Sequence, residues 1–266
     1  MNRFLMCAPD FFEIRYEINP WMDRTQGADR ALAREQWTRL HDTLRAMGAK
    51  VELVSPKQGW PDMVFTANAG LVSSRRFLLG NFRHPERQGE AAWFAKWFAE
   101  SGYEVARIEG DLAFEGEGDA LFCGDRLFCG HGYRTDLAAH AAVGALMGRE
   151  TVSLKLVNPH FYHLDTCFCP LGDGVVAWFP EAFDHESQQR VRASVSETIE
   201  VSREEAWRFA CNAVVMGRDV ALPEGCPNFC AALATHDFRC HPLPMSEFMK
   251  AGGACKCLAL GLGGLS

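Results

Sequence analysis

Cysteine is the side-chain type in this sequence with the greatest capacity for covalent chemistry, and the chain of 266 residues contains 11 of them. Cys257 stands out because it follows Gly252-Gly253, which lets the backbone approach a ligand closely, and because Lys256 beside it adds positive charge. A cysteine attacks a substrate as a thiolate, and it needs a nearby acid–base group and other residues that hold the substrate. The segment therefore predicts a nucleophilic cysteine, for which Cys255 is the rival.

A histidine and several acidic or amide side chains would complete such a site. His163 is the candidate acid–base group, although a lone histidine in a strand is more often structural. Glu115, in a glycine-rich segment, is either a site carboxylate or a solvated loop residue. Asp62 and Asn68 are six residues apart and share one face if their segment is extended. Together these residues fit a planar, cationic guanidinium, whose N–H groups carboxylates hold while a thiolate attacks its central carbon.

Most of the other cysteines fit a structural role. Cys226 and Cys230, with Cys240 and His241 further on, loosely resemble a zinc site, but a second paired motif is missing, so we expect no metal. An odd cysteine count in a chain of this length favours reduced thiols that are buried as small hydrophobic side chains. The first residues show no signal-peptide pattern. We therefore expect a cytoplasmic protein.

Composition and charge exclude several classes of protein. Hydrophobic residues make up 48% and charged residues 23% of the chain, which is typical of a folded protein. The formal net charge of -7 argues against a nucleic-acid partner, which would need a basic face. No apolar run approaches the roughly 18 residues of a membrane span. These features favour a small-molecule partner, while the length fits either one large α/β domain or two small ones.

The chain repeats a pattern of a short apolar strand, a turn containing glycine or aspartate, and a second apolar strand. One polar or nucleophilic residue marks each repeat, and the five markers lie 51, 46, 47 and 45 residues apart. The markers are Asn68, Asp119, Asp165, Asn212 and Cys257. This spacing is close to a regular period of about 47 residues, which predicts five similar structural units.

Helical patterns separate the hairpins over residues 89–101, 136–147 and 183–198. The first 54 residues supply the parts that the last repeat lacks, namely strand 4–7, helix 31–47 and strand 50–54. A chain whose first strands complete its last unit closes into a ring, and the markers converge at the centre of that ring, where a ligand would bind. The alternative is an ordinary α/β sandwich with coincidental spacing.

Seven motifs, in order along nearly the whole chain, resemble the guanidino-group-modifying (pentein) superfamily, which includes arginine deiminases, dimethylarginine dimethylaminohydrolases and amidinotransferases; the similarity is greatest to bacterial arginine dihydrolases. The motifs are CAPDFF at 7–12, INPWM at 18–22, WPDMVFTANAG at 60–70, HPER at 84–87, FEG at 114–116, FYHLDT at 161–166 and GGACKCL at 252–258. The resemblance implies an α/β fold, a five-bladed α/β propeller of pseudo-fivefold ββαβ repeats, in agreement with the period. It also implies one catalytic domain over residues 1–266 and chemistry without a cofactor or metal.

The resemblance further implies roles for individual residues. Cys257 would be the nucleophile, His163 the general acid and base, and Glu115 would hold the guanidinium beside the thiolate. The substrate-binding residues would be Arg87 and Arg134 at the α-carboxylate, Asn19 and Asp62 at the α-amino end, Asp165 at the guanidinium or the histidine, and Asn68.

The side chain at position 68 bears on the reaction. Deiminases and dimethylargininases generally have a second carboxylate where this chain has Asn68, whereas dihydrolase-type members have asparagine. One carboxylate with an amide tolerates the neutral ureido group of citrulline better than two carboxylates do, so we expect an arginine dihydrolase that forms ornithine, carbon dioxide and two ammonia. The alternatives are a dimethylarginine dimethylaminohydrolase, an arginine deiminase and a non-catalytic binding protein. Oligomerisation is left open.

Overall fold

A computed structural model describes residues 2–172 and 174–263. Its strands are β1 Arg3–Cys7, β2 Lys50–Val54, β3 Gly70–Ser73, β4 Arg76–Leu79, β5 Glu104–Ala106, β6 Ala120–Cys123, β7 Arg126–His131, β8 Glu150–Lys155, β9 Phe168–Gly172, β10 Val175–Trp178, β11 Glu197–Glu200, β12 Val214–Met216, β13 Asp219–Pro223, β14 Arg239–Leu243 and β15 Leu260–Gly261. They form five three-stranded sheets, ordered β15-β1-β2, β3-β4-β5, β6-β7-β8, β9-β10-β11 and β12-β13-β14. In each sheet the middle strand pairs antiparallel with one neighbour and parallel with the other.

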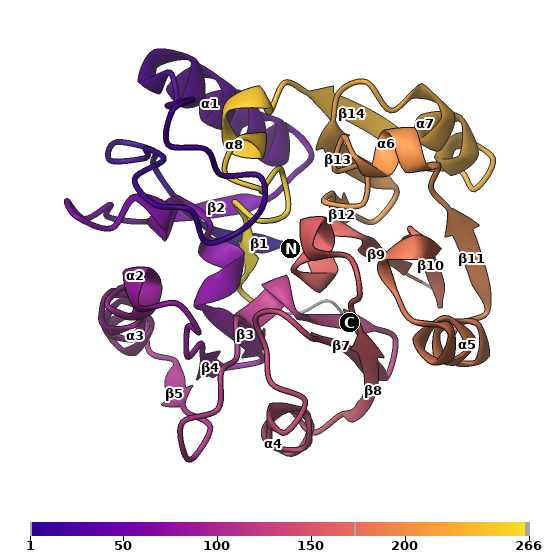
Figure 1. Cartoon of the computed structure of the whole chain (residues 1–266), viewed down its shortest axis with the longest axis horizontal. Helices are drawn as coiled ribbons and strands as arrows, with labels where there is room; N and C mark the ends of the chain where they lie inside the picture. The colour runs from indigo at the N-terminus through magenta and orange to yellow at the C-terminus, as the bar shows by residue number, and fades with distance from the viewer. Residues whose placement is uncertain (1, 173, 264–266) are drawn as a thin grey trace.

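One long helix accompanies each sheet and links its middle strand to the parallel neighbour. The helices are α1 Arg30–Ala46, α3 Glu90–Glu100, α4 Ala139–Met147, α5 His185–Ser194 and α7 Pro227–Ala234, with the short α2 Pro85–Gln88, α6 Arg203–Ala206 and α8 Ser246–Met249. Figure 1 shows the sheets around a common centre with the five long helices on the outside. The helices that the sequence predicted at 31–47, 89–101, 136–147 and 183–198 are confirmed, within five residues at each end.

The helix α1 illustrates why these segments form. Asp29 caps its first turn by accepting hydrogen bonds from the backbone N–H groups of the second and third residues after it. Trp37, Leu40 and Leu44 recur at helical spacing and are buried. Apolar side chains of this kind fill the space between each helix and its sheet, which leaves the centre of the ring to the buried polar residues.

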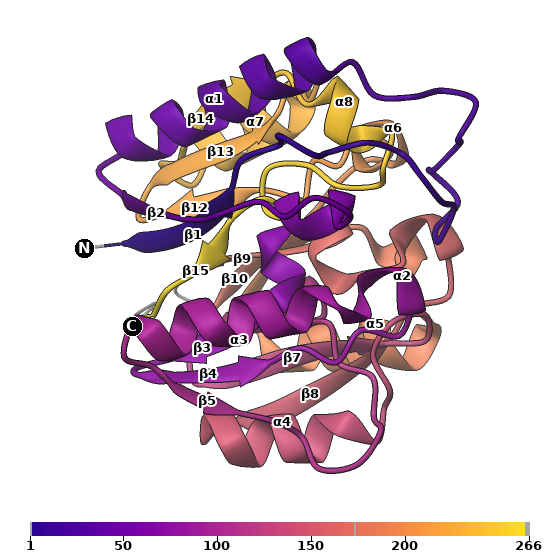
Figure 2. The same cartoon turned by 90° about the vertical axis from the view of Figure 1, so that its left-hand side faces the viewer.

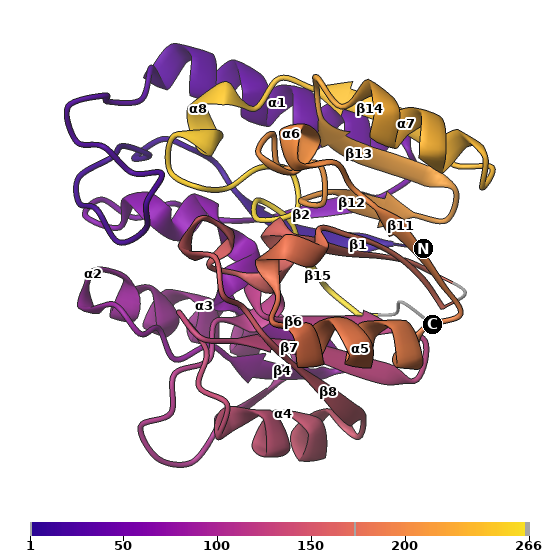
Figure 3. The same cartoon turned by 45° about the vertical axis from the view of Figure 1, so that its right-hand side comes forward.

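The ends of the chain close the ring, as the sequence predicted. β1 pairs antiparallel with β15, so that Phe4 lies opposite Gly261 and Leu5 opposite Leu260, and β1 pairs parallel with β2. In Figures 2 and 3 the two ends of the chain lie on one side of the ring, whereas the connection 8–29 and α8 lie on the opposite side. The connection 8–29 therefore covers one mouth of the ring's centre.

The segments that carry the repeat markers are not the strands that the sequence analysis expected. Asp62 lies in the 3₁₀-helix Pro61–Val64 and Asn68 in the 3₁₀-helix Thr66–Ala69, while Cys255 and Cys257 lie in turns before β15. The argument from strand alternation that placed Asp62 and Asn68 on one face was therefore wrong. Short 3₁₀ turns replace strands here because the chain must turn where it reaches the crowded centre, immediately before the first strand of each sheet.

Candidate active site

Cys257 is a buried thiol held between an acceptor and a donor. Its Sγ lies 3.2 Å from Oδ2 of Asp165 and 3.1 Å from Nδ2 of Asn212. Burial and the negative charge of Asp165 raise the pKa of the Cys257 thiol well above its usual value. Burial also raises the pKa of Asp165 to about 7, against the opposing charge of Lys256. The sulfur is therefore protonated at neutral pH and requires added positive charge to become a thiolate.

His163 and Glu115 form a second buried pair. Nε2 of His163 lies 2.7 Å from Oε2 of Glu115. Burial lowers the pKa of His163 to about 4, although the Glu115 carboxylate opposes this shift. Burial alone would raise the pKa of Glu115, but Arg134 and His163 lower it far below its usual value. The pair is thus a neutral imidazole that donates its Nε2–H to a carboxylate.

Arg134 contacts the same oxygen of the Glu115 carboxylate, Oε2, as His163 does. Its Nη1 donates to Oε2 of Glu115 at 3.0 Å, and its Nη2 donates to the backbone oxygen of Ile18 at 2.8 Å. The guanidinium lies over the ring of Tyr162, with 4.6 Å between the guanidinium carbon and the ring centroid. The carboxylate that was predicted to hold a substrate guanidinium therefore holds one from the protein itself.

Arg87 fixes the orientation of Asn68. Its Nη1 donates to Oδ1 of Asn68 at 2.7 Å, and its Nη2 donates to the backbone oxygen of Asp62 at 3.0 Å. Glu90 holds the same guanidinium with both carboxylate oxygens, at 3.0 and 2.8 Å. Because Oδ1 of Asn68 accepts from a cation, the amide has only one sensible assignment, with Nδ2 directed away from Arg87.

Three buried polar atoms of this site have no hydrogen-bond partner among the described residues. They are Oδ1 of Asp62, Nδ2 of Asn68 and Oδ1 of Asp165. Buried polar groups are nearly always hydrogen-bonded, because leaving one unpaired costs about 1–3 kcal/mol. Of these residues, Asp62 and Asn68 line the cavity beside Cys257, where a polar ligand can accept from the free donor of Asn68.

The space itself is small in this structure. A cavity of about 10 Å³ is lined by Asn19, Asp62, Asn68, Arg134 and Cys257, among others. This is room for about one water molecule. Nδ2 of Asn19 donates to the backbone oxygen of Ala251 at 3.0 Å, which ties the connection 8–29 to the segment before the nucleophile. The cavity is therefore closed from the side that this connection covers.

The structure brings all nine predicted site residues into one network of contacts. Cys257, Asn19, Asp62, Asn68, Arg87 and Arg134 line the cavity, while Glu115 and His163 join through Arg134, and Asp165 joins through Cys257. Cys255 is also buried, but it does not line this cavity. Sequence reasoning assigned no role in the site to Asn212, Tyr162 or Glu90. Of these three residues, only Asn212 could have been found from the sequence, because it is one of the five repeat markers.

Two further expectations concern metals and membranes. Within residues 2–172 and 174–263, no group of three or more His, Cys, Asp and Glu side chains is arranged to hold a metal ion. No helix in this part of the chain is long and apolar enough to cross a bilayer.

A central cysteine, with histidine, carboxylate and amide side chains around it and five small sheets outside, is the arrangement expected of the pentein superfamily. Residues 14–261 match the family model for eukaryotic N,N-dimethylarginine dimethylhydrolase, and the chain belongs to this dimethylarginine dimethylaminohydrolase family. It is 40% identical to the N(G),N(G)-dimethylarginine dimethylaminohydrolase of Mycobacterium tuberculosis, over 97% of this chain and 85% of that protein.

The chain is also similar to two bifunctional cyanobacterial proteins. It is 44% identical to the arginine dihydrolase/ornithine cyclodeaminase ArgZ of Synechocystis and 43% identical to AgrE of Nostoc, in each case over 97% of this chain. It spans only 37% of the length of either relative. The crystal structure of the N-terminal domain of ArgZ bound to substrate matches with a TM-score of 0.96 at 42% identity, over 99% of this chain and 98% of that one.

Proposed function

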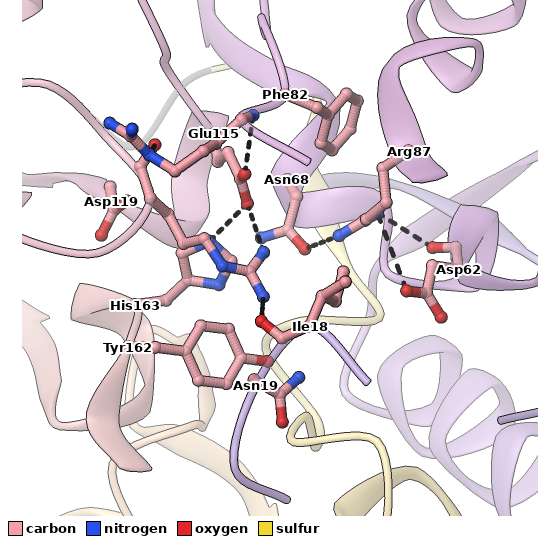
Figure 4. A network of polar contacts seen from close by, with 12 residues as sticks. Ile18, Asn19, Asp62, Asn68, Phe82, Arg87, Glu115, Asp119, Tyr162 and His163 are labelled. Carbon is pink, nitrogen blue, oxygen red and sulfur yellow. Dashed lines mark hydrogen bonds and ion pairs between the residues drawn. The ribbon is translucent and has the colours of Figure 1, made fainter. Parts of the chain in front are cut away.

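We propose that this protein is a cysteine-dependent arginine dihydrolase, which converts arginine through citrulline to ornithine, carbon dioxide and two ammonia. The observation that carries the proposal is the orientation of Asn68. Arg87 occupies its Oδ1, and the unpartnered Nδ2 is turned toward Glu115 and His163 (Figure 4). A donor at this position suits the carbonyl oxygen of a ureido group, which a second carboxylate would repel.

The relatives support the same substrate class. ArgZ and AgrE are named as arginine dihydrolases, and a crystal structure of an AgrE mutant contains L-arginine. A crystal structure of the ArgZ N-terminal domain is described as bound to product. The present chain corresponds to that domain in extent, since it covers 97% of it at 43% identity.

Binding of a cationic guanidinium activates the nucleophile. The positive charge placed beside Sγ of Cys257 favours the thiolate, and the thiol proton passes to Oδ2 of Asp165, 3.2 Å away. The pKa of about 7 at Asp165 suits this exchange. The carboxylates of Glu115 and Asp62 offset the cost of removing the substrate cation from water.

The first hydrolysis then proceeds through a covalent adduct. Sγ of Cys257 forms a bond to the guanidinium carbon, and the bond from that carbon to one terminal nitrogen breaks. The proton that left the thiol reaches the departing nitrogen through His163, and ammonia leaves. Water then gives a proton to His163 and its oxygen to the carbon, the C–S bond breaks, and citrulline forms. A second attack on retained citrulline consumes another water and yields ornithine, carbon dioxide and the second ammonia.

Arginine enters by replacing the guanidinium of Arg134. A cavity of about 10 Å³ is far smaller than an amino acid needs, so groups that close it must move. Arg134 is the group whose displacement frees Glu115. Once displaced, its guanidinium fork turns to the α-carboxylate of the substrate, as the family resemblance implied. Substrate binding therefore exchanges one guanidinium for another at the same carboxylate.

The same reasoning extends to the whole chain. We infer that the five sheets are the blades of an α/β propeller and that residues 1–266 act as one catalytic domain. The partner is a small-molecule substrate, and the hydrolysis uses no cofactor. The cysteine content suits a reducing compartment, so we place the protein in the cytoplasm.

Membership of the dimethylarginine dimethylaminohydrolase family favours one alternative, release of dimethylamine from dimethylarginine. Separate incubations with arginine, citrulline and dimethylarginine, followed by amino-acid analysis and an ammonia assay, distinguish the two. We expect ornithine and two ammonia per arginine, and turnover of citrulline supplied alone. One ammonia per arginine with accumulation of citrulline would instead identify a deiminase. Dimethylamine release without arginine turnover would identify a dimethylargininase.

A further inference from the structure

The Asn212 side chain uses every hydrogen-bonding capacity of its amide at the nucleophile. It is completely buried, in the turn before β12. Nδ2 donates to Sγ of Cys257 at 3.1 Å and to the backbone oxygen of Asp165 at 3.1 Å. Oδ1 accepts from the backbone N–H of Ala254 at 3.1 Å and from that of Cys257 at 3.2 Å. An amide has two donors and two main acceptor sites, so none is left over.

Oδ1 and Nδ2 of Asn212 have different roles. The contacts of Oδ1 hold the turn that carries Cys257, and they come from a neighbouring sheet, since Asn212 precedes β12 and Cys257 precedes β15. The contact of Nδ2 instead reaches the reacting atom. Asp165, on the other side of the sulfur, accepts the hydrogen bond of the thiol, and its negative charge raises the pKa of that thiol. Asn212 therefore supplies a donor that continues to favour the sulfur after its proton has gone.

We propose that Asn212 is a further catalytic residue, whose Nδ2 stabilises the thiolate of Cys257 while its Oδ1 fixes the turn that carries the sulfur. The proposal rests on the assignment of Cys257 as the nucleophile. It adds to the proposed function a donor to the attacking atom, separate from the groups that bind the guanidinium.

The repeat in the fold separates this role from a merely structural one. Asp119 is the equivalent marker in another unit, and its Oδ1 accepts the backbone N–H of Leu164 at 3.0 Å. Leu164 lies beside Asp165, the marker of the next unit, just as Ala254 lies near Cys257. An aspartate at such a position thus performs the anchoring function without donating. Asn212→Asp should therefore keep the anchor and remove the Nδ2 donor, which serves both the sulfur and the backbone oxygen of Asp165.

The experiment compares Asn212→Asp with the wild type and with Asn158→Asp. Asn158 is a matched control because its side chain only accepts a hydrogen bond, from the backbone N–H of His160, and an aspartate can do the same. For Asn212→Asp we expect an unchanged fold by circular dichroism, a KM within about threefold of wild type, and a kcat lowered about 10- to 100-fold, as for loss of a hydrogen bond to a charged group. The control should match the wild type in all three measurements.

Thiolate formation is measured independently of turnover, as the rate at which iodoacetamide alkylates Cys257 at different pH values. Cleavage after Lys256 separates Cys255 from Cys257, so mass spectrometry reads the two thiols apart. Asn212→Asp should shift the alkylation profile of Cys257 to higher pH. The ionisable groups that face this sulfur or its cavity, and that the variant leaves in place, are Asp165, Tyr162, Asp62, Arg87, Arg134 and Lys256.

A wild-type kcat and an unshifted alkylation profile in Asn212→Asp would overturn the proposal. If that variant does not fold, Asn212→Ser is compared with Asn212→Ala, because the hydroxyl can still donate. Cys257 should then be alkylated at lower pH in the serine variant than in the alanine variant, and the serine variant should have the higher kcat. Equal values in the two variants would also overturn the proposal. If the wild-type protein consumes neither arginine nor dimethylarginine, the proposed function fails, yet the alkylation profiles still test the contact between Asn212 and the sulfur.

Discussion

Replacing Asn68 by aspartate changes one NH₂ group to an oxygen and leaves the size of the side chain almost the same. Arg87 still has an oxygen to which it donates at 2.7 Å, so the new carboxylate stays where the amide was. The oxygen that replaces Nδ2 then points at the substrate beside Glu115. The site changes from one that offers an amide donor to one that offers a further negative acceptor.

The magnitude follows from this exchange of a donor for an acceptor. The ureido oxygen of citrulline loses a hydrogen bond, and the carboxylate repels its partial negative charge. This costs about 1–3 kcal/mol at a buried site. At about 1.4 kcal/mol per factor of ten, citrulline turnover should fall about 5- to 150-fold. Arginine gains an acceptor for one of its N–H groups, so we expect its first hydrolysis to stay within about tenfold of wild type.

The assay is the number of ammonia molecules released per arginine consumed, with citrulline and ornithine measured in the same samples. Wild type should release two ammonia, whereas Asn68→Asp should approach one and accumulate citrulline. Asn158→Asp controls for the general effect of an added charge. Unchanged turnover of citrulline by Asn68→Asp, with two ammonia still released, would refute the role given to the amide donor.

Three other predictions concern the nucleophile, the internal guanidinium and pH. Cys257→Ser should lower turnover by about 10³-fold or more, whereas Cys255→Ser should keep it, because Cys257 lines the cavity and Cys255 does not. The reverse order would exchange their roles. The Arg134→Gln variant should bind arginine more weakly, because it lacks the partner of the α-carboxylate. It should bind methylguanidine, which has no carboxylate, more tightly, because Glu115 is then free. If calorimetric titration shows that both ligands bind more weakly, the proposed replacement of the Arg134 guanidinium by that of the substrate is wrong. Burial raises the pKa of Asp165 to about 7, so its contribution to stability is present below about pH 4 and is lost as the pH rises through 7. The free energy of urea unfolding should therefore fall less steeply with pH in Asp165→Asn than in the wild type. An unchanged dependence on pH would contradict this prediction.

The order of elements could be predicted from the sequence because it is written in local patterns. The stripe of Trp37, Leu40 and Leu44 marks a helix whatever its surroundings, and the hairpins are set by apolar runs and their turns. The ring closure followed from counting units, since the last repeat lacks strands that the first 54 residues supply. β15 pairs with β1 as that count requires.

The conformation of the marker segments could not be predicted in the same way. Asn68 and Asp165 lie in 3₁₀ turns because five segments meet at the centre, and no local pattern records that crowding. The hydrogen-bond partners of the side chains could not be predicted from the sequence either, because Glu115 and His163 are separated by 48 residues and Asp165 and Cys257 by 92. The likeness to a known family named the residues of the site but not their contacts.

The sequence by itself determined which chemical groups this protein has and that five similar units would bring them together. A repeat places equivalent residues at equivalent positions, so the convergence of histidine, carboxylates, amides and cysteine follows from the period. Only the tertiary structure decided what each group faces. It placed Arg134 on Glu115, the carboxylate predicted to hold the substrate, turned the donor of Asn68 away from Arg87 and directed the amide of Asn212 at the sulfur. Such contacts depend on distances of about 3 Å between distant segments, which hydrogen bonding requires and sequence spacing does not specify.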